Sequence, residues 1–145
     1  MDIRLHHDYD VVRIACLFDG EGCVHFRRHG TQWANQLTIC NTVKAPLDLA
    51  KEIFGGSVCG SRKKGSNYIV WQWTVTGVKA EKAAQRLEPH CLIKREQLRV
   101  FLEARTTFRP DGSAPRLSAE YREKREACAA KLSMLRLPAQ MAIPR

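Results

Sequence analysis

The sequence predicts an α+β fold in which helices alternate with pairs of strands. Apolar residues recur at helical spacing between residues 11 and 18, and alternation with a period of two follows in 23–28 and 33–43. A similar succession of strand, strand and helix patterns returns between residues 57 and 105. The chain has 145 residues, of which 44% are hydrophobic, so it is long and apolar enough for one domain with a real core.

The first predicted elements are a helix and two strands. The apolar side of this helix consists of Val11, Val12, Ile14, Ala15, Leu17 and Phe18. Asp8 or Asp10 is available as its N-cap. A polar turn around Gly30 then separates a strand at 23–28 from a longer one at about 33–43.

The later elements follow from proline and glycine positions and from apolar stripes. Pro46 lies near a helix start, Gly55 and Gly56 close that helix, and Pro89 interrupts a later one. The expected order is a helix at 46–54, strands at 57–62 and 68–75 joined by a basic turn at 62–67, and helices at 79–87 and 93–105.

The C-terminal part predicts an appended helix. We expect a domain at 1–108, a Pro- and Gly-containing linker at 109–117, a helix packed on the domain at 118–137 and a tail at 138–145. Ser118 can cap this helix, and its narrow apolar stripe consists of Tyr121, Cys128, Leu132 and Leu135.

The charge of the chain indicates its class of partner. A net charge of +9 and a pI near 9.6 favour a polyanion. No apolar run approaches the ~20 residues that span a bilayer, and no signal peptide is recognised, so we expect nucleic acid rather than a membrane. The six cysteines include no CxxC pair and are typical of reduced thiols in an intracellular protein that is not secreted.

A zinc site is an alternative interpretation of Cys23, His25 and His29. Their spacing suits zinc, but a structural site takes four ligands, usually in two short-spaced pairs, and no second pair follows. Alternation on a strand explains Cys23 and His25 equally well.

The segment from Ile14 to Gly22, IACLFDGEG, is the most informative motif. An apolar helix runs into Asp19 and Glu21, each followed by a glycine that lets backbone, metal or phosphate approach closely. This order resembles the LAGLIDADG motif of homing endonucleases, whose variants commonly read DGEG at the acidic end. Cys16 stands where the family usually has glycine, and the resemblance covers about residues 8–105.

The resemblance implies an αββαββα domain whose curved antiparallel sheet forms a DNA-binding saddle. Since the chain holds one copy of the motif, it implies a homodimer whose first helices pack side by side through Ala15 and Cys16. Glu21 matches the position that binds metal, and the carbonyl of Gly20 resembles a secondary ligand. Asp19 matches the acidic position with a role nearer to structure and dimer contact.

The expected chemistry is hydrolysis of a phosphodiester. Mg²⁺ held by carboxylate and carbonyl oxygens can activate water and stabilise charge on the phosphate. We expect Mn²⁺ to substitute and Ca²⁺ to support binding without cleavage. Lys94, in the segment LIKREQ, matches a family lysine that points into the active site, where it polarises water or stabilises phosphate charge.

The polar face of the sheet is the expected DNA-binding surface, because a twisted sheet can enter the major groove. Lys63 and Lys64 in the basic turn are expected to bind phosphates, Arg62 a base or phosphate, and Arg95 the DNA backbone. Trp71 and Trp73 are assigned to the core. The expected outward residues are His25, Arg27, His29, Gln36, Thr38, Cys40, Thr42 and Gln72.

Together these features predict a homing endonuclease that makes a double-strand break in a long, near-palindromic DNA site. Two alternatives remain open, a maturase that binds intron RNA and a sequence-specific DNA-binding protein without nuclease activity. The presence of both Glu21 and Lys94 favours the enzyme, since a binding protein needs neither. We expect it to be intracellular and associated with DNA, in the cytoplasm or nucleoid or in an organelle.

Overall fold

A computed structural model describes residues 3–111, 113 and 117–137. Its elements follow the predicted order, with one short 3₁₀ turn (η1, Glu88–His90) between the last two helices of the domain. They are α1 (Ile3–Glu21), β1 (Gly22–His29), β2 (Gln32–Asn41), α2 (Ala45–Phe54), β3 (Ser57–Arg62), β4 (Ile69–Thr76), α3 (Gly77–Leu87), α4 (Arg95–Arg105) and α5 (Ala119–Leu135). The α+β class predicted from the sequence is therefore confirmed.

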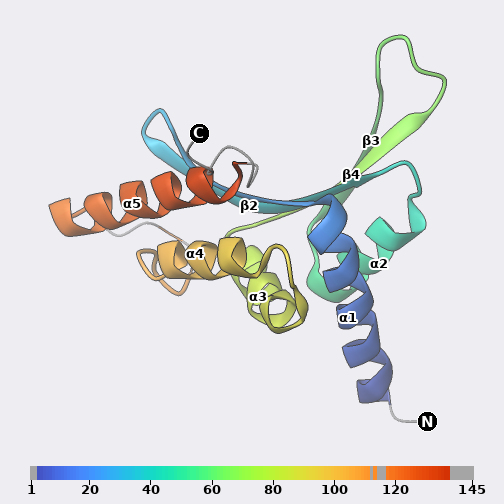
Figure 1. Ribbon diagram of the computed structural model, residues 1–145, viewed down its shortest axis with the longest axis horizontal. Coiled ribbons are helices and arrows are strands. Elements are labelled where there is room, and N and C mark those ends of the chain that lie inside the picture. The colour runs from blue at the N-terminus through green and yellow to red at the C-terminus, as the bar shows by residue number, and fades with distance from the viewer. Residues whose placement is uncertain (1–2, 112, 114–116, 138–145) are drawn as a thin grey trace, which may run out of the picture.

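The four strands form one antiparallel sheet in the order β1-β2-β4-β3. The sheet is curved, and α1 to α4 lie beneath it, so that its upper face is left free of these helices (Figure 1). The period-two alternation explains this layering, because Leu37, Ile39, Trp73 and Val75 all point to the helical side and are buried. The assignment of Trp73 to the core is confirmed.

The start of α1 differs from the prediction. The helix begins at Ile3, so neither Asp8 nor Asp10 is its N-cap. Asp10 instead lies within the helix and accepts a hydrogen bond from Nη1 of Arg13 at 3.3 Å, one turn further on. Such a pair stabilises the interior of a helix, so Asp10 does not indicate where α1 begins. No described helix is long and apolar enough to cross a membrane.

The last helix packs against α4 and β1, and its buried side differs from the predicted stripe. Cys128 and Leu132 are buried as expected, but the third buried residue is Arg125, which is 1% exposed. Tyr121 and Leu135 are exposed. Ser118 caps the helix as predicted, since its side-chain oxygen accepts a hydrogen bond from the backbone N–H of Tyr121 at 3.3 Å.

Two buried arginines fasten this helix, and we call Arg105, Thr107, Phe108 and Arg125 the arginine cluster. Nε of Arg125 donates to Oγ1 of Thr107 at 2.7 Å and its Nη2 donates to the Thr107 carbonyl at 2.9 Å. The guanidinium carbons of Arg105 and Arg125 lie 4.5 and 4.0 Å from the centre of the Phe108 ring. Cation–π contact with one ring therefore joins α4 to α5.

Candidate active site and nucleic-acid interface

The acidic end of α1 is exposed because glycines flank it. Gly22 is buried, and a Cβ at this position would collide with the ring and the carbonyl oxygen of Phe18, so only glycine lets the chain pass from α1 into β1. Gly20 is exposed, and nothing lies within 4 Å of the position that a Cβ would take there. The chain thus turns sharply at Gly22, and the space beside Gly20 is open.

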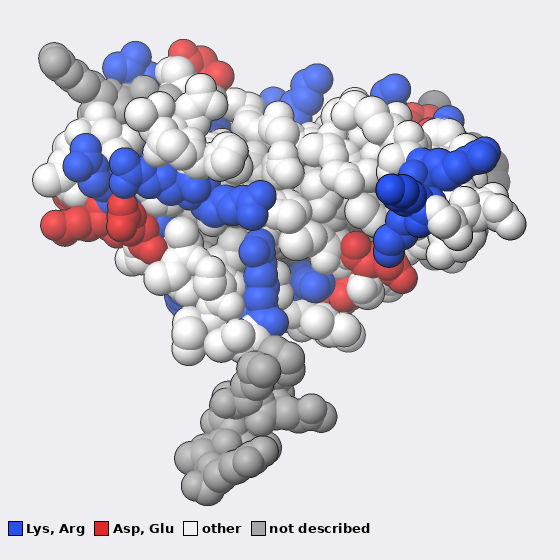
Figure 2. Space-filling view, turned by 90° about the horizontal axis from the view of Figure 1, so that it is seen from above, with Lys and Arg blue, Asp and Glu red and all other residues white. Residues whose placement is uncertain are grey.

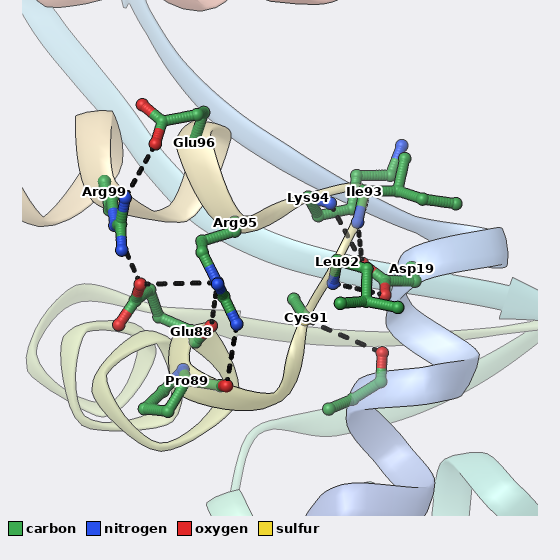
Figure 3. A network of polar contacts seen from close by, with 11 residues as sticks. Asp19, Glu88, Pro89, Cys91, Leu92, Ile93, Lys94, Arg95, Glu96 and Arg99 are labelled. Carbon is green, nitrogen blue, oxygen red and sulfur yellow. Dashed lines mark hydrogen bonds and ion pairs between the residues drawn. The ribbon is translucent and has the colours of Figure 1, made fainter.

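Asp19 is fixed by the backbone of the segment before α4 (Figure 3). Its Oδ2 accepts a hydrogen bond from the N–H of Leu92 at 2.7 Å, and its Oδ1 accepts from Ile93 at 3.0 Å and from Lys94 at 2.9 Å. We call Asp19 and residues 91–94 the aspartate cluster. One carboxylate therefore holds three consecutive N–H groups and attaches the start of α4 to the end of α1.

The charge of Asp19 is stabilised by these bonds. Partial burial alone would raise the pKa of this carboxyl, but the hydrogen bonds from Leu92, Lys94 and Ile93 outweigh it and lower the pKa below its usual value. Beneath it, Sγ of Cys91 lies 3.6 Å from the carbonyl oxygen of Ala15, and burial together with the charge of Asp19 raises the Cys91 pKa to about 12. Asp19 is an anion and Cys91 a neutral thiol at neutral pH.

Lys94 is the N-cap residue of α4 and is partly buried. The hydrogen bond from its N–H to Asp19 ties its backbone to α1 at a point two residues before Glu21. Arg95, which the sequence predicts as a contact of the DNA backbone, makes hydrogen bonds within its own chain. Its Nη2 donates to the Pro89 carbonyl at 2.9 Å and its Nε to the Glu88 carbonyl at 3.4 Å (Figure 3). Because these donors face η1, Arg95 links the start of α4 to η1 within the same chain.

Glu21 differs from Asp19 in being exposed and in having no side-chain hydrogen bond to the described part of the chain, whereas Asp19 accepts three. It borders an open hollow of about 350 Å³ at the ends of β2 and β4. Its lining consists of Glu21, Cys40, Asn41, Thr42, Tyr68 and Val70. The structure brings Glu21 together with Cys40 and Thr42 of the predicted set. Tyr68 was not among the predicted site residues, because a tyrosine at a strand end carries no signal of its own.

The donor set of a single chain is incomplete for a metal ion. No described residues form a group of three or more His, Cys, Asp or Glu side chains that could hold one. Glu21 nevertheless fits an ion such as Mg²⁺, which takes one or two carboxylates and completes its shell with water and phosphate oxygens. The carbonyl of Gly20 lies in the last turn of α1, where helix carbonyls have no partner within the helix.

The predicted outward residues that belong to strands lie on the upper face of the sheet by strand register, whereas Thr42 follows the end of β2. Cys23 pairs with Thr38, His25 with Gln36, and Cys40 with Gln72. Figure 2 shows this face from above, with Lys and Arg side chains on both of its halves. Arg27 and His29 near the end of β1, and Lys63 and Lys64 in the turn between β3 and β4, are exposed.

Two predicted contacts on the sheet need correction. Thr38 is only 4% exposed, and Nε2 of His25 hydrogen-bonds its Oγ1 at 3.1 Å, so this hydroxyl is already engaged within the chain. Burial, followed by the charges of Arg136 and Arg27, lowers the pKa of His25, so a neutral ring is present there at neutral pH. Arg62 pairs with Ile69 at the end of β3, with the strand parity of Trp71, and is exposed, so its contact with DNA stays a prediction.

Ala15 is likewise not a surface residue of α1. It is fully buried within its own chain, whereas Cys16 is exposed. The two residues are neighbours in the helix, so they point about 100° apart and only one can face outward. The exposed side of α1 instead carries Val12, Cys16 and Gly20, four residues apart.

Comparisons with known proteins support the fold. No protein-family model and no curated protein sequence matches the chain. Among solved structures, the homing endonuclease I-CvuI in complex with its target is 20% identical, with a TM-score of 0.73, over 90% of this chain and 84% of that chain. The archaeal intron-encoded homing endonuclease I-Vdi141I complexed with DNA is 15% identical, with a TM-score of 0.72, over 90% of this chain and 86% of that one.

A third structure differs in length. The LAGLIDADG meganuclease I-AabMI bound to uncleaved DNA is 17% identical, with a TM-score of 0.63, and the match covers 84% of this chain but only 44% of that chain. These identities support a statement about the fold. The resemblance that the sequence motif predicts is confirmed at this level: the chain has the fold of the LAGLIDADG homing endonucleases.

Proposed function

We propose that this protein is a homing endonuclease that cleaves both strands of a long, near-palindromic DNA site by metal-dependent hydrolysis. The observation that carries the proposal is the different environment of two acidic residues at the end of α1. Asp19 is bonded to three N–H groups, while Glu21, two residues on, is exposed beside an open hollow. The structure of this turn requires Asp19 but does not require Glu21.

Glu21 is the proposed metal ligand, with the Gly20 carbonyl as a second oxygen donor. When bound, Mg²⁺ would supply an activated water and stabilise negative charge on the scissile phosphate. Mn²⁺ is expected to replace it, and Ca²⁺ to support binding alone. I-CvuI has been crystallised with its target in the presence of Ca, and with the I-CreI target, which was not cleaved, in the presence of Mg.

Lys94 is the proposed second catalytic residue. Its backbone is fixed by Asp19 at the start of α4, which limits where its side chain can reach. An ammonium group near the phosphate would stabilise the charge that develops on its oxygens, and such preorganised donors contribute strongly to catalysis.

The active unit is proposed to be a homodimer. A single chain supplies only one exposed Glu21 carboxylate, which is too few metal ligands for cleavage of two strands. Two chains related by a two-fold axis would place two Glu21 side chains opposite two scissile phosphates. The exposed side of α1 supports this, because Val12, Cys16 and Gly20 form a narrow strip of small or apolar residues. The match to about half of the I-AabMI chain agrees with a fold of two such units.

The DNA-binding surface is proposed to be the upper face of the sheet. Exposed Arg27, Lys63 and Lys64 lie toward its two ends, where a duplex along the saddle would pass its phosphates. Gln36, Cys40 and Gln72 lie between them and are placed to contact base edges. The protein would then be associated with DNA inside the cell.

Glu21→Gln tests the proposal. The amide keeps the shape of the side chain but removes the charge that holds the metal, so cleavage of a DNA site selected by binding should fall below detection in Mg²⁺. Specific binding measured in Ca²⁺ should persist. A matched control is Glu52→Gln, on the exposed side of α2, which should cut like the parent. A Glu21→Gln protein with parental cleavage would refute the assignment.

A further inference from the structure

Two surfaces flank the exposed side of α1, and they differ in shape. Leu17 faces α2, whereas Asp19 faces the segment at residues 91–94. Each residue turns a helix by about 100°, so the two residues from Leu17 to Asp19 turn it by about 200°, which is about 160° measured the other way around α1. Cys16 and Gly20 lie within this sector of about 160°. The strip proposed to contact a second subunit therefore has one neighbour on each side.

The first neighbour is a groove. It has a volume of about 530 Å³ and lies between α1 and the start of α2. Its walls are mainly apolar and include Leu17, Val43, Pro46 and Leu49, with Arg13 at its edge. Val43 is 58% exposed, so this apolar lining is open to solvent in a single chain.

The second neighbour is a protrusion, which we call the apolar turn and which consists of Leu92 and Ile93. Leu92 is 84% exposed and Ile93 is 70% exposed. Their backbone is held rigidly, since both N–H groups donate to Asp19 (Figure 3). A fixed backbone that presents two bare aliphatic side chains is suited to a contact with another apolar surface.

Two-fold symmetry brings these surfaces together. If the two α1 helices pack side by side with both Glu21 residues at the same end, the two-fold axis runs roughly parallel to α1, and such an axis keeps every height along the helix unchanged. Leu17 and Asp19 are separated by about 3 Å along the helix axis, so groove and apolar turn lie at nearly the same height. Because they lie on opposite flanks of α1, rotation by half a turn places the apolar turn of one chain opposite the groove of the other.

We propose that the apolar turn of each subunit docks into the α1–α2 groove of a second copy of this chain, so that two such contacts flank the pair of α1 helices. This inference rests on the homodimer of the proposed function and identifies where its specificity lies. It also has a consequence for the active site. Lys94 directly follows Ile93, so docking would add a contact from the second subunit next to a lysine whose backbone Asp19 already holds.

A charge-pair experiment tests the docking. Ile93→Lys places a cation in the partner's groove, beside Arg13, and Val43→Glu places an anion opposite the partner's Ile93. Each variant alone should dimerise at least tenfold more weakly than the parent in sedimentation equilibrium without DNA. Both positions are exposed in the single chain, so circular dichroism should show parental folding.

Mixing the two variants should restore dimers and produce the mixed species. One of its two contacts pairs the introduced lysine with the introduced glutamate, and the other retains the parental Ile93 and Val43. Met134→Glu, at an exposed apolar residue of α5, is the control and should dimerise like the parent.

The outcomes separate this inference from the proposed function. A parent that dimerises while both variants dimerise equally well, without preference for the mixed species, overturns the docking and leaves the homodimer intact. A parent that stays monomeric both free and on DNA overturns the homodimer, and the docking with it. Weak single variants that recover on mixing support both.

Discussion

The aspartate cluster and the arginine cluster both fasten a helix to the rest of the chain, but with opposite charges and opposite accessibility. Asp19 lies at the surface and receives three backbone N–H groups. Arg105 and Arg125 are buried, and Nη2 of Arg105 has no hydrogen-bond partner among the described residues. The carboxylate that pairs with Arg105 belongs to Glu81 and lies 3.1 Å from its Nε.

The difference shows in the pKa values. Hydrogen bonds lower the pKa of Asp19, so its charged form is stabilised by the fold. Burial, and then the neighbouring charge of Arg105, lower the pKa of Arg125, so its charged form is disfavoured by its surroundings. The arginine cluster therefore depends on packing around Phe108, whereas the aspartate cluster depends on charge and leaves the adjacent Glu21 free for chemistry.

The strongest test of this contrast concerns Lys94, which the aspartate cluster positions. We expect Lys94→Met to lower the cleavage rate of bound DNA by about a hundredfold to a thousandfold, the cost of removing one preorganised donor from an active site. Stability should be unchanged. Single-turnover cleavage at saturating protein measures the effect.

The control is Lys63→Met in the turn between β3 and β4. It should weaken DNA binding and reduce the salt dependence by about one phosphate contact, without altering the rate of the bound complex. Equal loss of rate in both variants would indicate that Lys94 acts only through binding.

The next largest effect should come from the arginine cluster. Arg125→Ala removes the contact with the Phe108 ring and leaves the carbonyl of Thr107 without its donor. We expect a loss of about 3 kcal/mol in the free energy of unfolding, typical of a broken buried network. Urea denaturation followed by circular dichroism measures it.

Arg122→Ala lies on the same helix with an exposed side chain and should change stability by less than about 0.5 kcal/mol. If Arg125→Ala were equally harmless, the cluster would not be what holds α5. Cleavage should survive in both variants, because neither touches the end of α1.

The architecture could be predicted because apolar periodicity and glycine positions determine it directly. β3 was predicted at its observed bounds, since Gly55 and Gly56 mark where α2 stops and Arg62 begins a basic turn. The arginine cluster could not be predicted in this way. Arg125 counts as a polar residue in any periodic pattern, and nothing in the sequence signals that Thr107 and Phe108, which follow the end of α4, would cover it.

A smaller stability effect is expected for Asp19→Asn. The amide cannot accept three N–H bonds as a charged acceptor does, so we expect a loss of about 2 kcal/mol at pH 7. Because the Asp19 pKa is lowered in the fold, its contribution is present above the unfolded value of 3.8 and disappears as the pH falls through the folded value. The difference between parent and variant should therefore shrink below pH 4.

Asp10→Asn, at the partly exposed ion pair with Arg13, is the control and should show a much smaller difference at every pH. A penalty for Asp19→Asn that persists unchanged at pH 3 would mean that the charge of Asp19 is not what binds the turn.

The candidate site was only partly accessible from sequence. Glu21, Gly20 and Lys94 were assigned by resemblance to a motif, and their roles remain proposals. The partners of Asp19 are backbone N–H groups, which every residue except proline has, so no pattern of side chains marks them. Ala15 was misassigned because a motif records residue order, whereas burial depends on which side of α1 meets β1 and α3.

The test with the smallest expected effect compares how readily the two clusters open. The measured quantity is the labelling rate of a buried cysteine in or beside each cluster. Cys91 lies in the aspartate cluster and Cys128 on the buried side of α5, and both are buried with raised pKa values, so each thiol reacts only when its surroundings open. During iodoacetamide labelling followed by peptide mass spectrometry, exposed Cys16, Cys40 and Cys59 should react first. Cys128 should follow, because α5 is the last element and packs against one side of the domain, on α4, β1 and the segment at residues 106–108, and Cys91 should react last.

The two substitutions above should then separate the clusters. Arg125→Ala should accelerate labelling of Cys128 severalfold and leave that of Cys91 unchanged, whereas Asp19→Asn should do the reverse. If either substitution accelerates both thiols equally, the clusters open together with the whole domain. Independent acceleration would show instead that α5 can detach while the end of α1, with Glu21 and the segment carrying Lys94, stays assembled.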